Sequence, residues 1–549
     1  MDVKMKIYQS STPMPQVPNK GIYDLLFADT SFDDGQIVFK ECFGDHKEIS
    51  RGQLKLQLHR FGLGLQQKKG LKKGDVVLAI LPNMIGFPIA VFGCVFAGLI
   101  VAFANPAYSE KELKHIANLV EPKAIATVKP LLKQITNAGL SIESCIIMDQ
   151  PYGQGSTFVD DLLASESDAR KAKAVTVNDL NETAYLPCSS GTTGLPKAVM
   201  ISHRNMVSML VTLVSIPHFY DKPWRAVAVA PFFHAMALAN AVHLPLFKKG
   251  SYVAIMQRFD AGEFCDVVKN EKIDFANLAP PALRVLMAHP KVKQLNRIEL
   301  MCVGAAPLDA ELQQRAMDVF GCEIAQGHGM TETTVGTLGM QKKRKLGSCG
   351  PPMPGLELRV VDDDGNDVKQ GERGELLVRA GNIFRGYWKN EAATKETFTD
   401  DGQWLKTGDI AVVHDTGDFS IVDRKKELIK YKGYQVAPAE LEGLLLQHPK
   451  VAAAAVIGIY DKELVTELPR AYIQLKPDHK QEGQSNVEQL AKDLTEFIAK
   501  QTSSHKRLRG GVRILEQVPV NPSGKILRKE IRALAAKEEN EKSPLQAKL

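Results

Sequence analysis

The stretch PCSSGTTGLPKAVM, residues 187–200, gathers hydroxyl side chains, glycines and a lysine into one short loop. A Walker A phosphate loop has the form G-x-x-x-x-G-K-[ST]. Here Pro196 stands before Lys197 and Ala198 follows it, so the stretch does not fit that pattern. An anion bound at this loop must be held in another way.

The composition of the loop nevertheless suits a chain of phosphates. Gly191 and Gly194 permit backbone conformations that other residues rarely adopt. Lys197 adds a mobile positive charge. Neighbouring hydroxyl groups supply further donors, those of Ser189, Ser190, Thr192 and Thr193. The sequence therefore predicts phosphate binding, with a plain polar linker as the alternative.

On both sides of the loop, short β-rich runs alternate with helical stretches. The uncharged segment 76–109 divides at its prolines and glycines into a strand over 76–81, a helix over 86–97 and a strand over 100–104. Further strands are expected at residues 123–128, 144–149, 183–188, 198–202, 225–230 and 251–256. This alternation predicts an α/β fold of layered, mostly parallel sheets. Residues 356–380 indicate two strands joined by a polar turn, typical of an antiparallel, barrel-like piece.

A highly charged joint begins near residue 423 and suggests a boundary between two domains. We expect a large domain over residues 1–422 and a small, mobile α+β domain over residues 423–549. The small domain would contain strands over 451–460 and 469–476 and two helices. By charge pattern alone, Lys425, Lys426 and Lys430 would form a solvated helix face.

Composition excludes several classes of partner. The net charge of +6, from 69 basic and 63 acidic residues, implies no strong electrostatic field around the protein. The basic run 342–345 lacks interleaved aromatic residues, so nucleic acid is not expected as a partner. The 8 cysteines are widely separated, which fits buried thiols in a reducing compartment. On length alone, segment 76–109 would span a membrane, but its prolines favour buried strands and a helix, and no transmembrane segment is expected.

Two terminal features bear on localisation. The N-terminal residues lack the apolar core of a signal peptide. The last residues, Ala547, Lys548 and Leu549, resemble the Ser-Lys-Leu peroxisomal address. We therefore expect the peroxisomal import receptor as a partner and a peroxisomal location, with the cytoplasm as the alternative.

Further motifs follow the loop in a fixed order: PFFHAMAL (231–238), GAAPLDAEL (304–312), QGHGMTET (326–333), WLKTGDI (404–410), VDRKKELIKYKGYQVAPAELE (422–442) and NPSGKILRKE (521–530). Together with SSGTTGLPKAV they resemble the adenylate-forming enzymes, a superfamily of acyl-CoA synthetases, peptide-synthetase adenylation domains and luciferases. The resemblance covers residues 20–535. Within this superfamily, the sequence of segment 422–442 most resembles the 4-coumarate:CoA ligases and luciferases.

This resemblance implies a nucleotide site for ATP. Thr192, Thr193 and Lys197 would grip the β- and γ-phosphates, while Thr331 and the metal ligand Glu332 would contact the α-phosphate and help place Mg²⁺. The ribose would bind Asp409, assisted by Arg424. The remaining nucleotide-binding positions are Ser189, Ser190, Gly191, Gly194, Gln326, Gly327, His328, Gly329 and Met330.

The resemblance also implies two half-reactions. Lys525 would bridge the attacking carboxylate and the α-phosphate when the small domain closes. Rotation at the hinge residue Lys426 would then bring in Lys430 and Gln435 for thioester formation with coenzyme A. The coenzyme itself would contact Arg258, Lys432 and Gly433.

His234 would lie at the acyl site, although a lone histidine in an apolar stretch is usually a packed core residue. The acyl pocket would be lined by Met236, Asn240, Val303, Gly304, Ala305, Gly327, Gly329, Gly336 and Thr337. Because Met236 stands where coumarate ligases usually carry tyrosine, and Gly336 and Thr337 where they tend to carry bulkier residues, we expect a pocket that is roomier or differently shaped. None of these residues is cationic, so the distal end of the acid should be apolar or weakly polar, and an aryl or an alkanoic acid would fit.

Two positions depart from the family pattern. Ala198 replaces a glycine, and His328 replaces an aromatic residue, usually tyrosine, that lies against adenine. An imidazole can still stack, so weaker or pH-sensitive ATP binding is the expected consequence. The sequence predicts an ATP-dependent acyl- or aryl-CoA ligase, with a luciferase-like monooxygenase, a carrier-protein-loading enzyme and a silent nucleotide-binding protein as alternatives.

Overall fold

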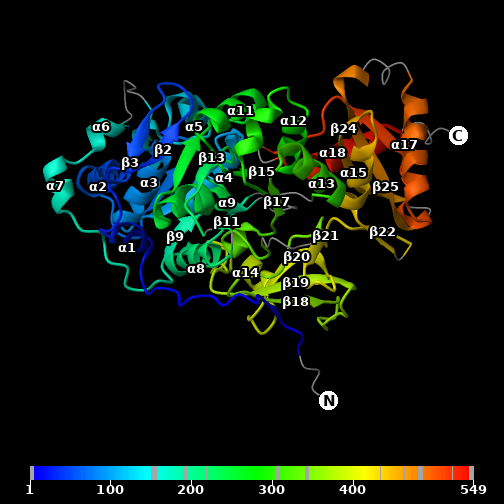
Figure 1. Ribbon diagram of the computed structural model, residues 1–549, viewed down its shortest axis with the longest axis horizontal. Coiled ribbons are helices and arrows are strands. Elements are labelled where there is room, and N and C mark those ends of the chain that lie inside the picture. The colour runs from blue at the N-terminus through cyan, green and yellow to red at the C-terminus, as the bar shows by residue number, and fades with distance from the viewer. Residues whose placement is uncertain are drawn as a thin grey trace.

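The computed structural model describes residues 5–149, 157–189, 196–217, 219, 221–304, 308–339, 345–432, 434–461, 464–479, 486–521 and 524–542. Within these residues the chain forms two large, mostly parallel sheets, an antiparallel sheet beside them and a small C-terminal domain (Figure 1). No helix among the described residues is long and apolar enough to cross a membrane.

The first parallel sheet has the order β12-β9-β5-β4-β6-β7-β8, with only β12 antiparallel to its neighbour. Its strands are β4 (Val76–Ala79), β5 (Ile100–Phe103), β6 (Ala124–Thr127), β7 (Cys145–Ile147), β8 (Thr157–Phe158), β9 (Thr183–Leu186) and β12 (Ile201–Ser202). The helices that accompany it include α3 (Gly86–Phe96), α4 (Glu110–Val120), α5 (Leu132–Asn137), α6 (Val159–Leu162) and α7 (Glu166–Lys171). The strand–helix–strand prediction for 76–104 is confirmed, and β4 and β5 are buried throughout, which explains why the segment carries no charge.

The second parallel sheet has the order β17-β16-β15-β13-β14-β2-β3, with only β3 antiparallel. Its strands are β2 (Ile37–Glu41), β3 (Glu48–Ser50), β13 (Arg225–Ala228), β14 (Tyr252–Ile255), β15 (Phe275–Leu278), β16 (Leu300–Val303) and β17 (Glu323–Gln326). Helices α11 (Ala261–Asn270), α12 (Pro280–Met287) and α13 (Ala310–Phe320) follow its strands. The carboxyl ends of the parallel strands therefore share one edge, where α/β folds bind ligands.

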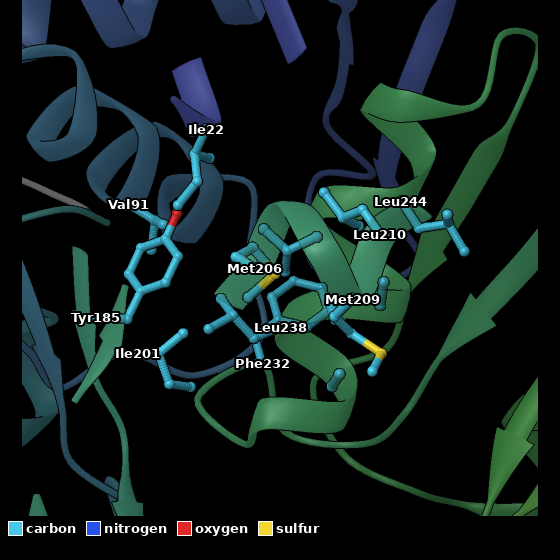
Figure 2. Close-up of a cluster of buried hydrophobic side chains, with 14 of the residues drawn as sticks. Ile22, Val91, Tyr185, Ile201, Met206, Met209, Leu210, Phe232, Leu238 and Leu244 are labelled. Atoms are coloured by element: carbon cyan, nitrogen blue, oxygen red, sulfur yellow. The ribbon is translucent and has the colours of Figure 1, made fainter. Parts of the chain in front are cut away.

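The largest core cluster joins the two sheets through α1 (Ile22–Phe27), α2 (Arg51–Lys68) and α8 (His203–Val214). Figure 2 shows side chains of α8, Met206, Met209 and Leu210, close to Phe232 and Leu238, which come from the segment after β13. Helix α8 begins with a capping box in which the Ser202 hydroxyl accepts the Asn205 N–H. The segment predicted to hold the acyl site is thus anchored directly in the core.

The antiparallel sheet contains β1 (Tyr8–Gln9), β18 (Glu357–Val361), β19 (Arg373–Arg379), β20 (Leu405–Val413) and β21 (Phe419–Arg424), which confirms the prediction for 356–380. Helix α14 (Glu391–Thr397) precedes β20. The single strand expected over 198–202 was wrong. Instead, β11 (Lys197–Ala198) pairs with β10 (Cys188–Ser189), while β12 joins the first sheet. The division occurs because the Met200 N–H donates to the carbonyl of Gly386, outside both pairings.

The small domain packs α15 (Pro438–Gln447), α17 (Val487–Gln501) and α18 (Arg528–Lys542) with a sheet of β24 (Val451–Asp461), β25 (Thr466–Leu475) and β26 (Val512–Leu515). The hairpin β22 (Ile429–Tyr431)–β23 (Tyr434–Val436) extends from it. The charged joint forms no helix, because the chain turns from β21 into β22 through a turn closed by Arg424. The exact boundary at residue 422 stays a prediction.

Candidate active site

Four segments of the predicted site follow strands of the second parallel sheet and so meet at its carboxyl edge. Met236 lies after β13, Arg258 after β14, Gly304 after β16 and His328 after β17. A side chain added at Gly304 would place its Cβ 3.8 Å from both the Met236 Sδ and the Gly327 carbonyl oxygen. Met236, Gly304 and Gly327 therefore line one space, as the resemblance implies.

The described ends of the phosphate loop are Ser189 and Lys197, which pair across β10 and β11. The predicted positions Ser190, Gly191, Thr192, Thr193 and Gly194 lie outside the described residues, as do Ala305 and Gly433. The Lys197 Nζ lies 4.6 Å from the ring centroid of Tyr387, and the Tyr387 hydroxyl donates to Glu332 Oε1 at 2.8 Å. Lys197 and Glu332 are thus connected through Tyr387, which the sequence reasoning missed because nothing in its local pattern marks it.

The segment that carries Thr331 and Glu332 is held by a second residue that the sequence reasoning missed. The Asn382 amide donates to the carbonyls of Thr333 at 2.7 Å and Gly336 at 3.3 Å. This bonding supports Thr334 at φ 60°, a left-handed conformation that is uncommon for threonine. Asn382 therefore fixes the turn after Glu332. Its only sequence signal is an asparagine after a glycine in a loop.

Asp409 and Arg424 are register partners on β20 and β21, and Arg424 Nε lies 2.5 Å from Asp409 Oδ1. The other carboxylate oxygen, Oδ2, lies 2.8 Å from His328 Nε2. Burial opposes ionisation of Asp409, but Arg424 and His328 outweigh it and hold the pKa of the carboxyl below its usual range. Asp409 is therefore an ionised acceptor, as ribose hydroxyls require.

The second ring nitrogen of His328, Nδ1, lies 2.7 Å from the hydroxyl of the fully buried Thr337. Thr337 was expected to line the acyl pocket. Its hydroxyl bonds to the His328 ring, and its place in the acyl pocket stays a prediction. The imidazole connects the loop after β17 to the antiparallel sheet.

Beside Gly336 the structure offers no extra room, and the prediction of a roomier or differently shaped pocket stays a prediction. A Cβ at Gly336 would lie 2.6 Å from the Met353 Cε, so the Met353 thioether already fills that space. Gly329 has a backbone role: its Cβ would lie 1.7 Å from the Val335 carbonyl oxygen. Glycine is required there because two backbone segments touch.

Three predicted site residues carry a buried polar side-chain atom with no hydrogen-bond partner among the described residues: His234 Nε2, Asn240 Oδ1 and Gln326 Oε1. Burial lowers the pKa of His234 to about 4, so its ring is neutral at pH 7. Buried polar groups are normally paired. These unpaired buried atoms suit a site in which a bound substrate supplies the missing hydrogen-bond partners.

Lys525 reaches this site from the small domain. Its backbone N–H donates to Asn521 Oδ1 at 2.9 Å, which closes a tight turn. In that turn Gly524 has φ 79°, and a Cβ there would lie 3.2 Å from Pro281 Cγ at the start of α12. Burial, reinforced by the charge of Arg424 and opposed by that of Asp409, lowers the pKa of Lys525. The turn therefore rests on the large domain with its lysine in the field of Asp409 and Arg424.

The groups predicted for the second half-reaction lie elsewhere. Lys430 and Gln435 are register partners on the β22–β23 hairpin, and both are exposed. Lys432 is exposed at φ 46°, and its N–H donates to Thr466 Oγ1 at 2.7 Å, within the small domain. Arg258 is exposed after β14, and Lys426 is exposed in the turn between β21 and β22. The structure thus buries Lys525 within the electrostatic influence of Asp409 and Arg424, and it leaves Lys430 and Gln435 exposed.

The family model described as AMP-binding enzyme matches residues 29–388, and the model described as AMP-binding enzyme C-terminal domain matches residues 440–525. The chain is 35% identical over 522 residues to 4-coumarate–CoA ligase 3 of Oryza sativa subsp. japonica, covering 92% of this chain and 89% of that one. It is 33% identical over 541 residues to peroxisomal OPC-8:0-CoA ligase 1 of Arabidopsis thaliana, covering 96% of each.

Solved structures share the fold. An anthranilate CoA ligase in complex with anthranoyl-AMP has a TM-score of 0.83 at 23% identity, covering 95% of this chain and 98% of that one. An o-succinylbenzoate coenzyme A synthetase from Bacillus subtilis in complex with ATP and magnesium ion has a TM-score of 0.76 at 24% identity, covering 93% of this chain and 99% of that one. These likenesses confirm the predicted α/β architecture with a separate C-terminal domain. The chain belongs to the AMP-binding enzyme family and is an AMP-forming acid–thiol ligase.

Proposed function

We propose that this ligase activates a mainly apolar carboxylic acid, aryl or alkyl, as its acyl adenylate and then transfers it to coenzyme A. The observation that carries the proposal is the meeting of Lys525 with Asp409 and Arg424. Asp409 and Arg424 belong to the antiparallel sheet, their charges act on the buried Lys525 of the C-terminal segment, and Asp409 is bonded to His328, which follows β17 of the parallel sheet. Such a site supplies charge compensation, which phosphoryl-group chemistry needs more than it needs a base.

In the first half-reaction, an oxygen of the acid attacks the α-phosphorus of ATP and pyrophosphate leaves. Asp409 would hold the ribose, and the Lys525 ammonium would bridge the two anions as they approach. His234, neutral at its pKa of about 4, would hold the acid without adding charge. A buried carboxylate beside the triphosphate would suit a hard cation that keeps most of its water, so Glu332 would help to hold Mg²⁺, which neutralises triphosphate charge when bound.

In the second half-reaction, the thiol sulfur of coenzyme A forms a bond to the acyl carbon, and AMP leaves with the electron pair of the broken acyl–phosphate bond. We place the hinge at Lys426, directly after the last strand of the large domain. Rotation there would withdraw Lys525 and turn the exposed Lys430 and Gln435 toward the adenylate. Lys432, Gly433 and Arg258 would then contact the coenzyme.

The test separates the two half-reactions with the variants Lys525→Ala and Lys430→Ala. For Lys525→Ala we expect acyl-adenylate formation to fall at least about 100-fold, because the bridging charge is lost. Thioester formation from supplied acyl adenylate should stay near the wild-type rate. Lys430→Ala should show the reverse pattern, and the two variants serve as controls for each other. Adenylation that survives in Lys525→Ala would overturn the assigned role.

Two alternatives predict different products. A luciferase-like monooxygenase would consume oxygen with its adenylate, and the relatives reported above give it no support. An enzyme that loads a carrier protein would form adenylate but no coenzyme A thioester. Mass spectrometry of adenylate and thioester, measured separately across aryl, phenylalkyl and alkanoic acids, distinguishes these reactions.

We also propose import into peroxisomes through Ala547, Lys548 and Leu549, which lie outside the described residues. The similarity to Ser-Lys-Leu and one relative named as peroxisomal support this location. In a eukaryotic cell, a fluorescent fusion ending in these residues should accumulate in peroxisomes. The same fusion without them should stay in the cytoplasm.

A further inference from the structure

Two oppositely charged side chains of the candidate site, Lys197 and Glu332, are separated by the side chain of Tyr387. The Lys197 Nζ lies 4.6 Å from the centroid of the Tyr387 ring, and the Tyr387 hydroxyl donates to Glu332 Oε1 at 2.8 Å. Both charged residues belong to the described part of the chain, and no ion pair joins their side chains directly. The tyrosine thus meets the cation with the face of its ring and the carboxylate with its hydroxyl.

The backbone of Tyr387 is joined to the strand that carries Lys197. Val199 lies opposite Tyr387 in a short antiparallel pairing, and the Trp388 N–H donates to the Ala198 carbonyl oxygen at 2.9 Å. Lys197 and Ala198 form β11, the strand that leaves the phosphate loop. The negative face of an aromatic ring attracts a cation. The pairing of the two backbones therefore keeps this face within reach of the lysine.

The side chain of Tyr387 is equally fixed toward Glu332. The Phe384 N–H donates to the Glu332 carbonyl oxygen at 2.8 Å, and the Phe384 and Tyr387 rings meet edge to face with their centroids 5.0 Å apart. Tyr387 is 7% exposed and Glu332 is 5% exposed. Burial, reinforced by the negative charge of Glu332, raises the pKa of Tyr387, so the hydroxyl stays protonated and continues to donate. The carboxylate is therefore held by a neutral donor and not by a cation.

This arrangement keeps the two charges from neutralising each other. Opposite charges in a partly buried site attract more strongly than they do in water. If Lys197 and Glu332 formed an ion pair, the lysine would be lost to phosphate and the carboxylate would be lost to a metal ion. Hydrogen bonds between charged partners are stronger than those to neutral groups. A charged ligand can therefore displace both contacts that Tyr387 makes.

We propose that Tyr387 is a positioning residue that separates Lys197 from Glu332 and keeps both available for the triphosphate of ATP and its metal ion. The proposal rests on the nucleotide site of the ligase function proposed above. The ring keeps the lysine apart from the carboxylate, and the hydroxyl orients the carboxylate. Substitutions at Tyr387 can remove these two contributions separately.

The test measures Kd for ATP by isothermal titration calorimetry, once in EDTA and once with excess Mg²⁺, with no acid present. Tyr387→Leu removes the ring and the hydroxyl and lets Lys197 pair with Glu332. Its Kd in EDTA should rise about tenfold, because an ion pair formed in about nine-tenths of the molecules leaves about one-tenth competent to bind. Glu332→Gln removes the competing carboxylate, so it should tighten binding in EDTA by a larger factor in Tyr387→Leu than in the wild-type background.

Tyr387→Phe keeps the ring and removes only the hydroxyl. Its Kd in EDTA should stay within about twofold of the wild-type value, because the lysine is still kept apart from Glu332. The gain in affinity on addition of Mg²⁺ should shrink by roughly 3- to 10-fold, the loss expected for one hydrogen bond. Since phenylalanine conserves the shape of the side chain, this variant also tests the proposal if Tyr387→Leu does not fold.

The matched control is Tyr252, another buried tyrosine between a cation and a carboxylate. Its hydroxyl donates to Glu271 Oε2 at 2.7 Å, and its ring centroid lies 3.9 Å from the Arg225 guanidinium carbon. Tyr252 begins β14, so it lies at the edge of the parallel sheet opposite to the site. Tyr252→Leu and Tyr252→Phe should leave both Kd values unchanged.

Three results would overturn the role of Tyr387. They are wild-type affinity of Tyr387→Leu in EDTA, an equal effect of Glu332→Gln in both backgrounds, and a full Mg²⁺ gain in Tyr387→Phe. Wild-type protein that bound no ATP in either buffer would contradict the proposed nucleotide site itself, and the role of Tyr387 with it. The failure of the proposed function is therefore distinguishable from the failure of this inference alone.

Discussion

At the scale of single residues, His328 connects Asp409, the residue proposed to bind ribose, to the core. Its ring joins Asp409 Oδ2 at 2.8 Å to the buried Thr337 hydroxyl at 2.7 Å. Replacement by phenylalanine keeps an aromatic face for adenine and removes both bonds. For His328→Phe we expect KM for ATP to rise by roughly 3- to 10-fold, the loss expected for one typical intramolecular hydrogen bond, because His328 acts on the nucleotide only through Asp409. Discrimination against 2′-deoxy-ATP should fall, because Asp409 would lose one of its two anchors.

Pyrophosphate release measured with ATP and 2′-deoxy-ATP checks this expectation. His414→Phe is the matched control, since it removes another hydrogen-bonded imidazole, on the loop between β20 and β21, where His414 Nε2 lies 2.8 Å from Ser420 Oγ. An unchanged ratio between the two nucleotides in His328→Phe would show that His328 does not position Asp409.

At the scale of elements, the contact of Gly524 with α12 bears on the proposed closure of the small domain. Gly524 has φ 79°, and a methyl group there would meet Pro281 of α12 at 3.2 Å. Gly524→Ala should therefore slow adenylation at least about tenfold, because the added carbon holds Lys525 away from the site. Thioester formation from supplied adenylate should be spared.

Stopped-flow measurement of the two half-reactions tests this prediction. The matched control is Gly417→Ala, where φ is 82° and nothing lies within 4 Å of the added carbon, so it carries the backbone strain without the contact. Equal losses in the two variants would mean that strain alone, and not contact with α12, explains the effect.

At the scale of the whole molecule, three buried imidazoles make the fold sensitive to acid. Burial lowers the pKa of His203, His234 and His243 to about 4 in each case, from 6.5. Between pH 6.5 and about 4 the unfolded chain therefore binds more protons than the folded chain. The stability that these three groups contribute is fully present above pH 6.5 and is lost as the pH falls toward 4. A shift of this size corresponds to about 3 kcal/mol per group.

Thermal unfolding measured from pH 7.5 to 4.5 should show a steep fall in Tm below pH 6.5. His203 accepts the Ile22 N–H through Nδ1 at 3.2 Å, and asparagine can supply a similar acceptor that does not titrate. His203→Asn should lower by about one the number of protons taken up on unfolding in acid, so that the unfolding free energy depends less steeply on pH. Tm at pH 7.5 should change little. An unaltered slope would exclude His203 as a contributor.

Much of the fold follows from the sequence by itself. The uncharged run 76–109 is divided by prolines into lengths that only two strands and a helix can fill, and the structure has β4, α3 and β5 there. The polar turn after residue 361 likewise separates β18 from β19. Motif order also determined the family, because the matching residue types recur at fixed places along nearly the whole chain. These are local signals, set by burial periodicity and turn chemistry.

Only the tertiary structure decided which residues meet. Tyr387 lies beside Lys197 and Glu332, and Asn382 holds the turn after Glu332, although no local pattern marks Tyr387 and only a Gly-Asn pair marks Asn382. Thr337 supports His328, and Met353 fills the space beside Gly336 that the sequence had left open. Residues so far apart in the chain are brought together by strand order and close packing, and sequence spacing encodes neither. The sequence thus determined the layers, the family and the type of reaction, whereas packing between distant segments decided which residues meet at the candidate site and how it is shaped.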